Sequence, residues 1–302
     1  MKKFEEALFT IAGKDRILKE EPMSKHTTFR VGGAADYYAA PDRELLPGLI
    51  RCCLEYDVPY MVIGNGSNLL VSDSGIRGMV IEIGKNMSDI SVEDTRIRVQ
   101  AGALLSRTAN EALANSLTGM EFAAGIPGCV GGAVVMNAGA YGGEMKDIIE
   151  TVTVLTKDGV EKKLRAEELD LSYRHSCIPE KEYLVLETEL SLTRGKQEDI
   201  RAKMDELKEQ RNTKQPLDYP SAGSTFKRPE GYFAGKLIMD AGLRGFQIGG
   251  AAVSEKHCGF LINKDGASAA DVYHLIREVQ KRVEQQFGVK LEPEVKMVGD
   301  FT

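Results

Sequence analysis

The chain has 302 residues, of which 42% are hydrophobic and 28% charged, as in a globular protein of about two domains. This composition excludes collagen-like, disordered and disulfide-scaffold classes. The net charge is −6, and no stripe of lysine and arginine alternates with aromatic residues. We therefore expect no nucleic-acid partner.

Two features of the sequence bear on its compartment. The first residues, Met1 to Glu6, are not followed by an apolar segment with a small-residue cleavage site, which predicts a cytoplasmic protein. The number of cysteines is odd and no C-x-x-C pair occurs, so a reducing compartment fits better than a disulfide framework. The cysteines are Cys52, Cys53, Cys129, Cys177 and Cys258.

One segment, residues 122–143, has no charged side chain over 22 positions and is long enough to resemble a membrane span. It contains seven glycines together with Pro127 and Asn137, which argue against a helix. We therefore expect no membrane insertion.

The first two thirds of the chain alternate between short apolar strands and amphipathic helices. A strand, a Gly32-Gly33 turn and a second strand are expected over 27–39, and a buried strand at 60–63 ends in a glycine-rich loop. Further strands are expected at 78–83, 90–92, 96–100, 151–156, 161–164 and 184–192, the last three in an antiparallel sheet. Helices are expected at 42–56, 104–117 and 195–214.

The last third of the chain begins at a boundary that two prolines mark, Pro216 and Pro220. Ser268 is placed to cap a long helix, with Asp271 three residues later and Gly288 at its end. We expect a final strand over 289–298.

Two glycine-rich loops carry the strongest chemical signal. Loop one is residues 64–68 (Gly-Asn-Gly-Ser-Asn), and loop two extends from Gly125 to Gly143. Neither matches a Rossmann fingerprint or a P-loop. Without Cβ atoms such loops let backbone N–H groups converge on phosphate oxygens, and two of them would suit a diphosphate, although tight turns would explain the same glycines.

Other common catalytic signatures are missing. The four histidines show no metal-ligand spacing, so we expect no metal site. No G-x-S-x-G elbow supports a serine triad.

Several polar motifs accompany the two loops. Together the segments are residues 27–33, 64–70, 125–128, 136–142, 172–174 (Ser-Tyr-Arg), 222–227 (Ala-Gly-Ser-Thr-Phe-Lys), 247–252 and 291–295 (Leu-Glu-Pro-Glu-Val). In order and spacing, over nearly the whole chain, they resemble one family, the UDP-N-acetylenolpyruvoylglucosamine reductases. The length is similar to that of the shorter family type, which lacks an inserted substrate-covering loop.

The resemblance implies an α+β fold. A two-subdomain FAD-binding module of the vanillyl-alcohol-oxidase type would be followed by a smaller α+β substrate-binding domain. The implied boundaries are 1–85 and 86–214 for the two subdomains and 215–302 for the substrate domain.

The resemblance also implies a reaction: NADPH reduces bound FAD, which then reduces UDP-N-acetylglucosamine enolpyruvate to UDP-N-acetylmuramate, a cytoplasmic step of peptidoglycan precursor synthesis. Ser224 would donate a proton, while Arg174 and Glu294 would stabilise negative charge on the substrate. Lys227 and Arg228 are secondary candidates for binding the substrate diphosphate. The implied FAD contacts are Gly64, Asn65, Gly66, Ser67, Asn68, Gly125, Ile126, Pro127, Gly132 and Gly139.

Purely structural roles would also explain these residues. Ser224 could be a turn hydroxyl bonded to backbone, Arg174 a member of a surface ion pair, and Glu294 an exposed carboxylate at the start of a strand. Two rival functions also stay open. One is a flavin oxidase or dehydrogenase that acts on another substrate, and the other is a non-catalytic nucleotide-binding module. The oligomeric state is left open.

Overall fold

The structure is a computed structural model that describes residues 2–301. The chain forms two compact units. The first unit comprises residues 2–18, 38–65 and 79–211, and the second comprises residues 19–37, 66–78 and 212–301. The chain passes from one unit to the other at five points, which lie within β1 (Leu18–Pro22), β2 (Ala34–Ala39), loop one, β5 (Ile76–Glu82) and α5 (Gln197–Lys214).

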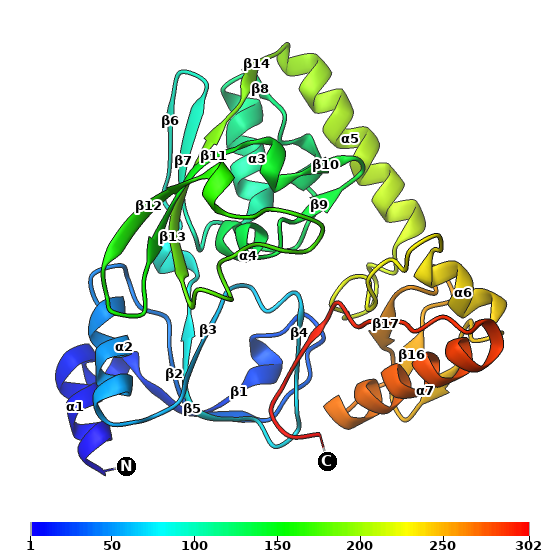
Figure 1. Ribbon diagram of the computed structural model, residues 1–302, viewed down its shortest axis with the longest axis horizontal. Coiled ribbons are helices and arrows are strands. Elements are labelled where there is room, and N and C mark those ends of the chain that lie inside the picture. Colours follow the sequence, from blue (N-terminus) through cyan, green and yellow to red (C-terminus); the bar gives the residue numbers. More distant parts are fainter. Residues whose placement is uncertain (1, 302) are drawn as a thin grey trace. The chain divides into compact units, whose positions relative to one another are not determined.

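A five-stranded antiparallel sheet forms the centre of the first unit (Figure 1). Its strand order is β12 (Glu161–Arg165), β11 (Ile149–Leu155), β13 (Leu184–Ser191), β7 (Arg96–Gln100) and β6 (Ile90–Glu93). In β7, Ile97 and Val99 are buried while Arg96 and Arg98 are exposed, the alternation of a sheet with one solvated face. The predicted antiparallel sheet is confirmed.

Helices cover the apolar surface of this unit. α4 (Val130–Val135) packs against β7 and β13, and α1 (Lys2–Ala12) packs against α2 (Leu46–Glu55). α3 (Leu105–Ala114) buries Leu105, Ala109 and Leu113, the face that the sequence predicts. α5 (Gln197–Lys214) buries only Ile200 and Leu207, as expected of a solvated helix.

Short strand pairs complete the first unit. β3 (Tyr60–Ile63) runs parallel to the last four residues of β5. β8 (Leu117–Thr118) pairs with β14 (Thr193–Arg194), and β9 (Gly139–Ala140) pairs with β10 (Gly143–Glu144).

The second unit is built around α7 (Ala269–Phe287), which packs on a small antiparallel sheet. That sheet has the order β15 (Gln247–Ile248), β16 (Ala251–Val253), β17 (Leu261–Asn263). α6 (Ala234–Asp240) packs against α7, and β4 (Leu69–Val71) runs parallel to β18 (Lys296–Val298). β1 (Leu18–Pro22) lies at the start of this unit along the chain.

The predicted caps of α7 are confirmed. The Ser268 hydroxyl accepts a hydrogen bond from the Asp271 N–H, and the Asp271 carboxylate accepts one from the Ser268 N–H, both at 3.0 Å. Gly288 ends the helix with φ +68°, a left-handed conformation that glycine adopts without strain.

Three expectations about elements are wrong. Residues 27–31 form a turn because the Arg30 N–H donates to the Thr27 carbonyl and Arg30 has φ +56°. Residues 289–295 are not a strand, since Pro293 has no N–H to continue a ladder, and only 296–298 pair. The glycine-rich segment does contain a helix, the six-residue α4, which packing on the sheet stabilises despite Gly131 and Gly132.

Between Lys2 and Phe301, none of the helices combines the length and the apolar character that a membrane span needs.

Candidate active site

Loop one presents unused backbone donors. The N–H groups of four consecutive residues, Gly64 to Ser67, donate no hydrogen bond to any residue between 2 and 301. Nearby, the buried hydroxyl of Thr28 also has no partner among the described residues, and the Thr28 N–H donates to the Gly66 carbonyl over 3.2 Å. Unpaired polar groups of this kind fit an anionic ligand such as a diphosphate.

The two glycine loops meet in the first unit. The side-chain amide of Asn65 donates to the Pro127 carbonyl over 2.7 Å. A Cβ on Gly64 would collide with the sulfur of Cys129, so only glycine allows this approach. The structure therefore brings together the predicted cofactor residues Gly64, Asn65 and Pro127.

Gly66 needs to be glycine for two reasons. Its φ is +58°, in the left-handed region. A Cβ there would also overlap the His26 carbonyl and come within 3.0 Å of the Thr27 Cα. The turn at residues 27–31 thus packs directly on loop one within the second unit.

The remaining predicted cofactor residues of loop two are spread along the loop, before α4, in its first turn and in β9. Gly125 lies against Arg211, since a Cβ on Gly125 would be 3.1 Å from the Arg211 Cδ. Ile126 is half-buried and donates its N–H to the Ala123 carbonyl over 3.1 Å. Gly132 is exposed in the first turn of α4. Gly139 begins β9, where a Cβ would be 2.8 Å from the Glu144 Cβ.

Arg174 lies at the tip of a tight turn that Ser172 and His175 close with two backbone hydrogen bonds of 3.2 and 3.1 Å. Its φ is +56°, and its guanidinium donates to the Gly139 carbonyl over 3.4 Å and lies 5.0 Å from the Tyr173 ring. Arg174 therefore contacts loop two, next to a predicted cofactor residue.

Asn137 holds this turn in place. Its side chain is fully buried and donates to the Glu144 carboxylate over 2.7 Å and to the Ser172 carbonyl over 3.0 Å. The Asn137 side-chain oxygen Oδ1 accepts from the Lys146 N–H at 2.8 Å. The sequence motif contains Asn137, but sequence reasoning assigned it no role. The available signal was that Asn137 is the one amide side chain in the uncharged segment 122–143.

Ser224 and Glu294 come from distant parts of the chain and are neighbours in the second unit. The Glu294 N–H donates to the Thr225 carbonyl over 2.8 Å, and Phe226 pairs with Pro293 in an antiparallel bridge. Thr225 and Phe226 are buried, while Ser224 is exposed and its hydroxyl makes no hydrogen bond with any residue between 2 and 301. The exposed hydroxyl is thus available to a substrate.

The two secondary candidates for substrate binding both have protein partners. Lys227 makes a 2.5 Å ion pair with Glu292. The Arg228 guanidinium lies 3.9 Å from the centroid of the Phe233 ring, and its Nε donates to the Tyr232 carbonyl over 3.3 Å. A diphosphate that binds Lys227 would have to compete with Glu292.

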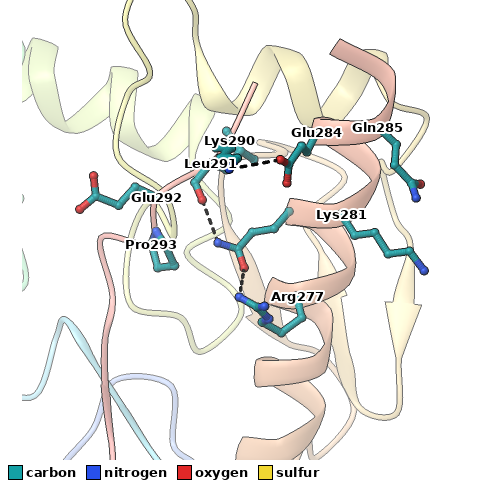
Figure 2. A pocket seen from close by; sticks show the side chains of 9 residues that line it. Arg277, Lys281, Glu284, Gln285, Lys290, Leu291, Glu292 and Pro293 are labelled. Atoms are coloured by element: carbon teal, nitrogen blue, oxygen red, sulfur yellow. Dashed lines mark hydrogen bonds and ion pairs between the residues drawn. The ribbon is translucent and has the colours of Figure 1, made fainter. Parts of the chain in front are cut away.

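A cavity of about 760 Å³ lies beside the segment that leads to Glu294 (Figure 2). Gln280 of α7 is one of the residues that line it, and its side chain donates to the Leu291 carbonyl over 2.8 Å and accepts from Arg277 at 3.0 Å. Sequence reasoning missed Gln280, because only its hydrogen bond to Leu291, 11 residues later, distinguishes it from other polar residues of α7. The helix therefore braces the backbone just before Glu294.

Comparison with known proteins supports a role of the two glycine-rich loops in cofactor binding. A sequence profile described as an FAD binding domain matches residues 37–165, and one described as the C-terminal domain of UDP-N-acetylenolpyruvoylglucosamine reductase matches residues 215–298. These matches and the glycine loops define a flavoprotein of the FAD-binding oxidoreductase class. The chain belongs to the UDP-N-acetylenolpyruvoylglucosamine reductase family.

Relatives support this assignment over nearly the full length. A UDP-N-acetylenolpyruvoylglucosamine reductase of Agathobacter rectalis is 59% identical over 94% of this chain and 95% of its own. The crystal structure of that reductase from Thermus caldophilus has 36% identity and a TM-score of 0.80, covering 94% of this chain and 98% of its own. The predicted family, the α+β fold class and the FAD cofactor are confirmed.

The FAD-binding fold is shared more widely. A glucose dehydrogenase, Phl p 4.0202, has a TM-score of 0.51 over 65% of this chain and 44% of its own at 14% identity, a likeness of fold alone.

Proposed function

We propose that this protein reduces the enolpyruvyl group of UDP-N-acetylglucosamine enolpyruvate with NADPH, forming UDP-N-acetylmuramate for peptidoglycan synthesis. The observation that carries the proposal is the bridge between residues 225–226 and 293–294, which places Ser224 and Glu294 on neighbouring segments. Family membership supplies the substrate class, a sugar nucleotide.

Bound FAD would supply the redox chemistry by taking a hydride from NADPH and passing it to the substrate. The residues present fit this cofactor, because the four unused N–H groups of loop one and the unpartnered Thr28 hydroxyl offer donors to a diphosphate. We assign cofactor contacts to Gly64, Asn65, Gly66, Ser67 and Asn68. In loop two, the assigned contacts are Gly125, Ile126, Pro127, Gly132 and Gly139.

Hydride addition to the vinyl β-carbon leaves negative charge on the α-carbon and the adjacent carboxylate. In our proposal Ser224 donates its hydroxyl proton to the α-carbon, which suits an exposed hydroxyl with no competing protein partner. Arg174 and Glu294 stabilise the charge on the carboxylate, Arg174 by its permanent positive charge and Glu294 by sharing a proton. Lys227 and Arg228 are assigned to the substrate diphosphate.

The division into two FAD subdomains, 1–85 and 86–214, and a substrate domain, 215–302, is also part of the proposal. The reductase C-terminal profile, which starts at residue 215, supports the last boundary. A cytoplasmic location is supported by the free thiols of all five cysteines, which suit a reducing compartment.

An absorbance spectrum of the purified protein and two turnover assays test the function. We expect a flavin spectrum, FAD release on denaturation, and NADPH consumption that depends on the enolpyruvyl sugar nucleotide under anaerobic conditions. A protein that takes up no FAD, or whose flavin is reduced by sugars and reoxidised by oxygen but not by this substrate, would contradict the proposal.

A further inference from the structure

Arg211 is a cation without a counter-ion in the first unit. It lies in the last turn of α5 and is half-buried. Its guanidinium makes no hydrogen bond and no ion pair with any residue in the described range 2–301, whereas Arg43 and Arg96 of the same unit pair with glutamates at 2.7 Å. Proteins rarely leave a partly buried charge unpaired, because desolvation is not offset.

The surroundings of Arg211 are loop two. A Cβ on Gly125 would be 3.1 Å from the Arg211 Cδ and 3.2 Å from Nη1, so glycine leaves room for the arginine. Burial lowers the pKa of the guanidinium, and the charge of neighbouring Tyr141 opposes this effect. Arginine stays charged nonetheless, because the ordinary pKa of a guanidinium lies far above neutral pH.

We infer that Arg211 binds a diphosphate group at loop two. The inference rests on the proposed function, which provides two sources of that group, the pyrophosphate of FAD and the diphosphate of the UDP-sugar. The planar guanidinium can donate two parallel hydrogen bonds to phosphate oxygens, which a lysine cannot do. Gly125 and Arg211 would then act together, the first by leaving space and the second by supplying charge.

Two binding titrations of the full-length protein distinguish the sources. FAD is titrated into the flavin-free protein by fluorescence quenching, and UDP is titrated into the FAD-loaded protein by calorimetry. Arg211→Gln removes the positive charge. Arg211→Lys keeps the charge but cannot donate two parallel hydrogen bonds as the planar guanidinium can. Arg201→Gln is the matched control, because Arg201 is an exposed arginine of the same helix.

A charge-assisted pair of hydrogen bonds predicts a loss of affinity on the order of 10- to 100-fold for Arg211→Gln. A loss confined to FAD assigns Arg211 to the cofactor, and a loss confined to UDP assigns it to the substrate. Arg211→Lys should fall between Gln and wild type, and Arg201→Gln should match wild type.

Wild-type affinity of both Arg211 variants for both ligands would overturn the inference while leaving the function intact. Failure of the wild-type protein to bind FAD would instead contradict the proposed function. Should Arg211→Gln fail to fold, Arg211→Lys decides alone, because unchanged affinity for both ligands in that variant counts against the bidentate role.

Discussion

The side-chain amide of Asn68 donates a hydrogen bond to the backbone carbonyl of Glu294 over 3.1 Å. Asn68 ends the first glycine loop, and Glu294, the carboxyl group proposed to stabilise charge on the substrate, lies near the end of the chain, 226 residues later. The Glu294 N–H is held as well, by the Thr225 carbonyl at 2.8 Å. The backbone of Glu294 is therefore fixed between the cofactor loop on one side and the Ser224 segment on the other.

Ser224→Ala should leave FAD binding and the reduction of flavin by NADPH nearly unchanged, because protonation of the substrate does not involve NADPH. Substrate-dependent flavin reoxidation should slow by about 10²–10⁴-fold, the usual contribution of a positioned acid. Anaerobic stopped-flow spectroscopy measures the two half-reactions separately.

The control for this experiment is Ser221→Ala, since no chemical role is proposed for Ser221. A large loss at Ser221, with Ser224→Ala near wild type, would show that the wrong serine has been assigned. Ser224→Cys keeps a proton donor and should retain more activity than Ser224→Ala.

Arg174→Lys and Glu294→Gln should each impair reduction of the enolpyruvyl substrate by at least tenfold and flavin reduction by NADPH much less. Lysine keeps the charge of Arg174 but loses the planar fork, and glutamine removes the ionisable proton of Glu294 while keeping its shape. Equal losses in the two half-reactions, measured by stopped flow, would point to displaced flavin or misfolding instead.

Gly66→Ala should lower the affinity for FAD by at least tenfold, because the new Cβ would overlap the His26 carbonyl. Gly266→Ala is the matched control. Gly266 has a similar φ, +65° against +58°, but no atom lies within 4 Å of a Cβ there. Both variants carry backbone strain of about 1 kcal/mol, so fluorescence titration isolates the effect of the collision. Equal affinities in the two variants would remove loop one from the cofactor site.

Asn137→Ala should lower the free energy of unfolding by about 2–4 kcal/mol, since it removes a fully buried side chain that makes three hydrogen bonds, to the Glu144 carboxylate, the Ser172 carbonyl and the Lys146 N–H. Urea denaturation of the flavin-free protein measures the change. Asn110→Ala serves as the control because its side chain bonds only to the Ser106 carbonyl on the exposed surface of α3. The assigned role requires Asn137→Ala to be clearly the less stable of the two.

His257 should make the protein less stable in mild acid. Burial lowers the pKa of the His257 imidazole, and its Nδ1 accepts a hydrogen bond from the Gly259 N–H at 3.1 Å, which requires that nitrogen to be unprotonated. The folded state thus binds fewer protons than the unfolded state between the folded pKa and the unfolded value near 6.5. This contribution to stability is complete above pH 6.5 and is lost as the pH falls toward the folded pKa.

Urea denaturation of wild type and His257→Gln between pH 5 and pH 8 tests this sign. The variant should show a flatter dependence of unfolding free energy on pH than wild type. Parallel curves would mean that His257 titrates normally in the folded protein.

Local sequence determined the elements whose signals are local. Ser268, Asp271 and Gly288 bound α7 because a cap depends only on residues within one turn of the helix end. The alternation of Ile97 and Val99 with arginines likewise placed β7 over the residues expected, Arg96–Gln100. The two glycine loops and the family were also visible in the sequence, since they depend on residue type and order.

Tertiary structure decided what depends on distant partners. α4 forms in a glycine-rich segment because β7 and β13 offer a surface to pack on, and residues 291–294 stay irregular because Gln280, Thr225 and Asn68 satisfy their backbone groups one by one. Arg211 gave no signal among the many charges of α5, and only its burial against Gly125 without a counter-ion singles it out. Burial and hydrogen-bond pairing are properties of the folded chain, so residue type and spacing alone do not specify them.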